Sequence, residues 1–115
     1  MSAIILRSGA EMIAEERARQ QRAKDKGGEG WTPEHDDRHE LGELGMAAES
    51  YLSAVVTPDE EGDEHGKPRP SWDWPWDKKW WKPSDDPIRN LVIAGALIAA
   101  EIDRMQRAKV QEVKP

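Results

Sequence analysis

The segment Trp31–Glu40 (WTPEHDDRHE) gathers the side chains best suited to metal or proton-transfer chemistry, with four carboxylates and two imidazoles among ten residues. It also has the signature of a helix start, with Thr32 as N-cap and Pro33 at the first helical position. Acids in a first turn complement the helix dipole, but about one of them is enough for that purpose. The surplus indicates a cation site or a proton-transfer role. The alternative is a solvated, well-capped helix start.

The apolar periodicity places these acids relative to the core, within a helix predicted over residues 33–56. From residue 41 the apolar side chains recur on one helical face, at Leu41, Leu44, Ala48, Leu52 and Val55. Extended backwards at about 100° per residue, this face passes through Asp37 and Glu34, with Glu40 on its flank and Asp36 on the far side. Carboxylates aligned with a core need a partner to stay ionised. We expect Glu34, Asp37 and Glu40 to border a wet cleft or to hold Mg²⁺ or Mn²⁺.

The same segment carries His35 and His39, which lie four residues apart. This spacing could form a zinc pair on one side of a helix. The alternative is that both imidazoles simply face solvent, because they lie opposite the apolar stripe.

A further helix is predicted to begin with Asp86 as N-cap, followed by Pro87, and to run to about Val110. It is apolar almost all round over residues 91–100. Glu101 falls on its apolar side. It could complete the acidic site from this second helix, or it could be a core glutamate paired with Arg17, Arg19 or Arg89. Asn90, near the helix start, could reach a metal or a phosphate.

Residues 57–83 form a long segment without periodicity between these helices. Its first half is acidic, and a disordered loop is predicted over residues 58–68. Its second half is rich in tryptophan. Trp76, Trp80 and Trp81 could form a flat wall for a nucleobase, with Lys82 near the phosphates. The alternative is that these rings cover a small helical core, since the chain has no phenylalanine.

The pattern as a whole predicts an all-α fold, because alternating apolar runs are nearly absent. At 115 residues the chain is expected to form a single domain, residues 1–115, with three main helices. The first is opened by a capping box at Ser8 and runs to about Lys24. The last helix has more apolar circumference than two neighbours can cover. We therefore expect a homo-oligomer, either a dimer or a tetramer.

Composition excludes several classes of function. A net charge of −6 argues against general nucleic-acid binding, which needs a basic surface. Without cysteine the chain has no disulfide and no thiolate metal site. The longest apolar run, residues 91–100, is half of the roughly 20 residues needed to span a bilayer. The expected location is therefore the cytoplasm, away from the membrane.

Several longer motifs resemble a group of small phage and prophage proteins described as MazG-like. The first is WTPEHDDxH, which begins at Trp31, and the second is GEL at residues 42–44, followed by AA at 47–48 and by Tyr51. The third combines WPW and WWKP within residues 74–83, and the fourth combines RNLVxAGALI and AEI within residues 89–102. The resemblance covers about residues 16–107. The wider MazG family is all-α, oligomeric and magnesium-dependent. Its members hydrolyse nucleoside triphosphates to a monophosphate and pyrophosphate, using a Glu-x-x-Glu pair and a Glu-x-x-Asp pair on successive helices.

The resemblance implies a metal-dependent (deoxy)nucleoside triphosphate pyrophosphohydrolase in the cytoplasm of a bacterial host. Glu40 and Glu43 match the first acidic pair in letters, whereas the second pair is degenerate, with Asn90 in place of its aspartate. On this hypothesis the catalytic acids are Glu34, Asp37 and Glu101, with Glu40 as a further metal ligand, and the nucleotide contacts are Trp76, Trp80, Trp81, Lys82 and Asn90. The metals would polarise the phosphate and activate water. The competing hypothesis is a non-catalytic phage accessory protein that binds a host protein through its acidic, tryptophan-bearing surface.

Overall fold

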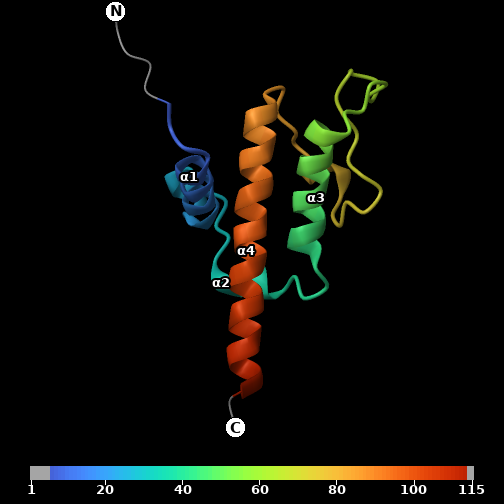
Figure 1. The fold of residues 1–115 in the computed structure, drawn as a ribbon. Helices are drawn as coiled ribbons and strands as arrows, with labels where there is room; N and C mark the ends of the chain where they lie inside the picture. Colours follow the sequence, from blue (N-terminus) through green and yellow to red (C-terminus); the bar gives the residue numbers. More distant parts are fainter. Residues whose placement is uncertain (1–5, 114–115) are drawn as a thin grey trace, which may run out of the picture.

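The computed structural model describes residues 6–113, and every regular element within that range is helical. The α-helices are α1 (Gly9–Gln21), α2 (Pro33–Asp37), α3 (Glu43–Val56) and α4 (Pro87–Val113), and 3-10 turns occur at Lys24–Lys26 and Lys78–Trp80. Figure 1 shows α4 in the middle, α1 and α3 on either side of it, and the C-terminal part of α4 continuing beyond both. The prediction of an all-α fold with a central last helix is confirmed.

The predicted helix starts follow from local capping. The Ser8 hydroxyl accepts a hydrogen bond from the Glu11 backbone N–H at 3.1 Å, and the Thr32 hydroxyl accepts one from the His35 N–H at 3.2 Å. The Asp86 carboxylate likewise accepts a hydrogen bond from the Ile88 N–H at 3.0 Å, at the start of α4. Each cap satisfies a backbone donor that the helix itself leaves unpaired.

The single helix predicted over residues 33–56 is wrong, because the chain divides there into α2 and α3. Between them Gly42 adopts φ = 84°, in the left-handed region that suits glycine, and it is the N-cap of α3. The Glu43 carboxylate stabilises the break by accepting a hydrogen bond from the Leu41 backbone N–H at 2.6 Å. The apolar stripe of α3 therefore cannot be extended backwards into α2.

The core lies between α3 and α4 and is built mainly from small side chains. Its buried members are Leu44, Ala47, Ala48 and Tyr51 of α3, with Ala94, Leu97 and Ala100 of α4. The aromatic rings of Trp31, Trp74, Trp76 and Trp81 are partly buried and pack against this cluster. They supply the volume that the alanines lack. The tryptophans thus cover the core, as one of the two sequence interpretations expects.

The acidic segment after α3 is closed at its neck by an ion pair that we call the Asp59–Arg69 clasp. The guanidinium donates hydrogen bonds to the carboxylate at 2.7 and 2.8 Å, and the Arg69 backbone N–H donates another at 3.0 Å. These bonds, with one from the Gly62 N–H, hold the pKa of Asp59 far below its usual range. The predicted disorder of residues 58–68 stays a prediction.

Among the described residues, no helix is both long enough and apolar enough to cross a bilayer.

Candidate functional site

A cavity of about 720 Å³ lies between the three helices α1, α3 and α4. Residues 24–39, which include α2, and residues 74–84 complete its lining, and we call it the tryptophan cavity. Its aromatic wall consists of Trp31, Tyr51, Trp74, Trp76 and Trp80. Pockets for small molecules and cofactors typically have volumes of about 300–1,000 Å³. Flat aromatic faces bind other planar groups by stacking. In size and surface chemistry, the cavity fits an aromatic ligand.

Contacts among the rings hold this wall in place. The ring centres of Trp74 and Trp76 lie 5.4 Å apart, edge to face, and Trp81 contacts Trp74 at 5.2 Å and Tyr51 at 4.7 Å. The Tyr51 hydroxyl accepts a hydrogen bond from the Lys82 backbone N–H at 3.3 Å, which ties α3 to the tryptophan segment. Burial raises the pKa of the Tyr51 hydroxyl. Tyr51, Trp74 and Trp76 of the wall are therefore supported by the core.

The rest of the lining is basic, although the whole chain carries a net charge of −6. Its cationic side chains are Arg19, Lys24, Arg38, Lys82 and Arg89. These outnumber the two acids of the lining, Glu16 and Glu29. A concave surface with an excess of one charge raises the local concentration of ligands of the opposite charge. The cavity thus favours an anion.

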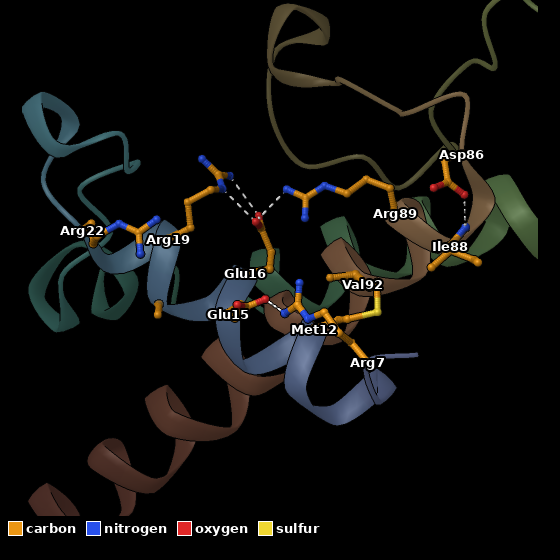
Figure 2. A pocket seen from close by; sticks show the side chains of 11 residues that line it. Arg7, Met12, Glu15, Glu16, Arg19, Arg22, Asp86, Ile88, Arg89 and Val92 are labelled. Atoms are coloured by element: carbon orange, nitrogen blue, oxygen red, sulfur yellow. Dashed lines mark hydrogen bonds and ion pairs between the residues drawn. The ribbon is translucent and has the colours of Figure 1, made fainter. Parts of the chain in front are cut away.

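Glu16 of α1 fixes two of these arginines, as Figure 2 shows. Its carboxylate is buried and accepts hydrogen bonds from Arg19 at 2.7 and 2.9 Å and from Arg89 of α4 at 2.7 Å. Burial alone would raise the pKa of Glu16, but the hydrogen bonds from both arginines outweigh it and lower that pKa. Two guanidinium groups from different helices are thereby held side by side at the edge of the tryptophan cavity.

The same three side chains also border a smaller pocket, of about 410 Å³, between α1 and the start of α4. Figure 2 shows that Arg7 there contacts Glu15 rather than Glu16. This ion pair is largely exposed, so it contributes little to stability. The smaller pocket has no aromatic ring in its lining. The tryptophan cavity is the better candidate site.

At another part of the cavity wall, two histidines each contact a carboxylate. Nδ1 of His35 lies 2.9 Å from Asp36, and Nδ1 of His39 lies 3.3 Å from Glu43. Asp36 is fully buried, and its second oxygen accepts a hydrogen bond from Arg17 at 3.2 Å. Both imidazoles line the cavity. The expectation that the two imidazoles face away from the core is therefore wrong. The expectation that Asp36 lies on the far side is wrong as well.

The reason for these errors is the break at Gly42, since the orientation of α2 is independent of the stripe on α3. Asp36, and not Asp37 or Glu34, is the acid that points inward. Glu34 and Glu40 are exposed. The predicted alignment of Glu34 and Asp37 with the core is therefore wrong.

The acids proposed to hold a metal instead contact arginines or solvent. Asp37 accepts hydrogen bonds from Arg107 at 2.8 and 3.0 Å, and Glu101 pairs with Arg104 at 2.5 Å. The pairing of Glu101 with Arg17, Arg19 or Arg89 is therefore not observed. Within residues 6–113, no group of three or more His, Asp and Glu side chains is arranged to hold a metal ion. The predicted Mg²⁺ or Mn²⁺ ligands do not fit such an ion in this arrangement.

The predicted nucleotide contacts divide into two groups. Trp76, Trp80 and Lys82 line the tryptophan cavity, whereas Trp81 packs against the core outside the lining. Asn90 is buried, and its amide brackets Ser84 by accepting from the Ser84 N–H at 2.8 Å and donating to the Ser84 carbonyl at 2.9 Å. Asn90 therefore positions the turn before α4 and does not line the tryptophan cavity.

Sequence reasoning missed Glu16 and the cavity positions of Arg19 and Arg89. Glu16 lies in a helix whose interior is mostly polar, and nothing in its neighbourhood marks it as buried. Its partner Arg89 is 73 residues away in the sequence. Only the packing of α1 on α4 brings them together.

No known protein family, curated protein or solved structure matches this chain.

Proposed function

We propose that this protein binds a nucleotide in the tryptophan cavity. The observation that carries the proposal is the combination, in one cavity of about 720 Å³, of five aromatic rings and five cationic side chains. A nucleotide has a planar base and a strongly anionic phosphate chain, so it matches both parts of this lining. Base stacking on an aromatic side chain contributes about 1–3 kcal/mol to binding. We also propose that the protein is cytoplasmic.

The phosphates are best placed over the side chains of Arg89 and Lys82. Glu16 fixes Arg89 through a single guanidinium nitrogen, Nη2. The other guanidinium nitrogens of Arg89 can therefore donate hydrogen bonds to an anion. Lys82 is exposed, and its Nζ lies 5.9 Å from the centre of the Trp80 ring. Arg19 makes three hydrogen bonds to acids and contributes mainly its charge.

Hydrolysis of the nucleotide is not included in this proposal. The resemblance to MazG-like proteins implies that Glu34, Asp37 and Glu101 hold a divalent metal, but Glu34 is exposed and the other two are bound to Arg107 and Arg104. Those carboxylates would have to exchange their arginines for the ion. Pyrophosphohydrolase activity and MazG-like ancestry stay predictions.

We further propose a homo-oligomer formed through α4. Four large apolar residues of this helix are exposed and recur on one face: Leu91, Ile98, Ile102 and Met105. They lie on the central helix, and 41–57% of each residue remains exposed. A second copy of the chain would remove this stripe from water.

The alternative function, binding of a host protein, is favoured by one observation. Trp72 is 96% exposed, next to the acidic segment. An exposed tryptophan of this kind is typical of a residue that anchors a protein partner. The two hypotheses differ in their critical residues, because Trp72 lies outside the lining of the tryptophan cavity.

Titration with ATP in the presence of EDTA tests the nucleotide proposal. Lys82→Glu removes a cation of the lining and adds a repelling charge, and Lys79→Glu is its matched control. Both lysines are exposed and lie near the Trp80 ring, at 5.9 and 5.3 Å, but only Lys82 lines the cavity. We expect Lys82→Glu to weaken ATP binding about tenfold or more, equivalent to about 1.4 kcal/mol, and Lys79→Glu to weaken it about twofold.

A second pair of variants tests the aromatic wall in the same titration. Trp80→Ala should weaken binding of ATP about tenfold through lost stacking, whereas Trp72→Ala should leave it unchanged. Tryptophan fluorescence or calorimetry gives the affinity. The proposal fails if the wild-type protein binds no ATP at millimolar concentration, or if each variant behaves like its control.

A further inference from the structure

We propose that His35 and His39 form a binding site for a divalent transition-metal ion of the zinc class. Each imidazole contacts a carboxylate through Nδ1, at 2.9 Å to Asp36 and 3.3 Å to Glu43. This inference concerns different residues from the phosphate and base contacts above. It does not depend on nucleotide binding.

The carboxylates determine which ring nitrogen is available to a metal. When Nδ1–H donates to a carboxylate, the neutral imidazole carries its lone pair on Nε2. A metal-binding histidine usually has such a carboxylate or carbonyl partner, which fixes the tautomer and makes the imidazole a better ligand. Within residues 6–113, neither Nε2 of His35 nor Nε2 of His39 makes a hydrogen bond. Both are therefore suited to act as ligands.

The spacing of the ring centres also fits a shared ion. Two imidazoles bound to one tetrahedral zinc at about 2.0–2.1 Å have ring centres roughly 5 Å apart. The centres of the His35 and His39 rings are separated by 5.1 Å. Trp31 stacks on His35 at 5.5 Å, and Trp76 contacts His39 at 5.2 Å, so the row of four rings restricts their rotation.

Burial and charge support the same inference. Asp36 is fully buried and is held by Arg17, while the side chains of His35 and His39 are only 26% and 20% exposed. A carboxylate placed so deeply is more than the start of a five-residue helix requires. Asp36 and Glu43 supply negative charge behind the imidazoles, which favours a cation in front of them.

Two protein nitrogens leave the remaining coordination positions open to the cavity. Since no third acid or histidine joins the pair within the described residues, water or an anionic ligand would complete the coordination. Imidazole nitrogens prefer Zn²⁺, Ni²⁺ and Co²⁺ to Mg²⁺, whose ligands are oxygens. The site is thus distinct in chemistry from the oxygen-ligand magnesium site that the acids of this segment suggest.

Titration with Zn²⁺ or Co²⁺, without nucleotide and in a buffer that contains excess Mg²⁺, tests the inference. The chain has three histidines, so His65→Asn is a matched control for His35→Asn and His39→Asn; His65 is exposed in the acidic segment. Asparagine keeps an N–H donor for the neighbouring carboxylate and removes Nε2. We expect the wild type and His65→Asn to bind one ion per chain, and the other two variants to lose at least tenfold in affinity.

The carboxylate partner is tested with Glu43→Gln, which is preferable to a change at the buried Asp36 because it disturbs folding less. Loss of an outer partner typically weakens metal binding about 10–100-fold, and the visible absorption of bound Co²⁺ should change with it. Circular dichroism checks that each variant keeps its helices. If the wild type binds neither ion at millimolar concentration, or if His65→Asn loses as much affinity as His35→Asn and His39→Asn, the inference is overturned.

Discussion

At the scale of single residues, Glu16 shows how a buried charge joins two helices. Its carboxylate has almost no contact with solvent, yet two arginines of the tryptophan cavity neutralise it, and their side chains are 32% and 40% exposed. Breaking a fully buried ion pair typically costs about 3–5 kcal/mol. The partial exposure of Arg19 and Arg89 lowers the value expected here, because water compensates them in part.

We therefore expect Glu16→Gln to reduce the free energy of unfolding by about 2 kcal/mol at neutral pH. Because the folded protein lowers the pKa of Glu16 below 4.5, the charged carboxylate stabilises the fold above that pH. This stabilisation is lost as the pH falls through the lowered pKa. Urea unfolding at several pH values should show the wild type and Glu16→Gln converging below about pH 4.5.

The adjacent Glu15 is the control for this experiment. It is exposed and pairs with Arg7 on the surface, so Glu15→Gln should change the unfolding free energy by less than about 1 kcal/mol. Equal destabilisation by both variants, or a Glu16→Gln difference that does not depend on pH, would contradict the account of the Glu16 cluster.

At the scale of elements, Gly42 decides the relation between α2 and α3. Gly42→Ala should destabilise the fold by about 1–2 kcal/mol, because an L-residue is strained at φ = 84° although a Cβ would meet no atom within 4 Å. Gly9→Ala is the control, since its Cβ also has open space and its φ is not positive. Thermal unfolding should show a clear loss for Gly42→Ala alone. An equal effect of both changes would show that the break does not depend on Gly42.

Local patterns could be predicted from the sequence, and relations between elements could not. The caps at Ser8, Thr32 and Asp86 depend on residues within three positions of one another, and all three are confirmed. The orientation of Asp36 depended on a continuous helix, and Gly42 breaks that helix. Because of this one glycine, Asp36 points inward in place of the predicted Asp37.

The candidate site was predictable to a similar extent. The tryptophan segment indicated a ligand wall from composition alone, and Trp76, Trp80 and Lys82 do line the cavity. The arginines of the lining could not be assigned, because Arg89 meets Glu16 only across the packing of α1 on α4. Residue type gave the chemistry of the site, and long-range contacts determined which residues take part.

At the scale of the whole molecule, the exposed stripe on α4 should determine the state of association. We expect the wild type to sediment as a dimer or tetramer at micromolar concentration, and Ile102→Glu to shift it to the monomer, because a charge cannot be buried there without a partner. Ile102 is 51% exposed. Val56→Glu is the control, since Val56 is 66% exposed at the end of α3, away from the stripe. A wild type that is monomeric, or an equal shift in both variants, would contradict this proposal.

The Asp59–Arg69 clasp has a consequence for how the chain tolerates change over time. The ion pair and its backbone hydrogen bonds fix the neck, and the hydrogen bonds of residues 62–66 stay within residues 59–67. Lengthening a loop with fixed ends costs little, about 0.6 kcal/mol for each doubling. We therefore expect insertions or a grafted peptide in residues 62–66 to leave the cavity unchanged. The clasp separates a part of the chain that is free to evolve from a part that must keep its geometry.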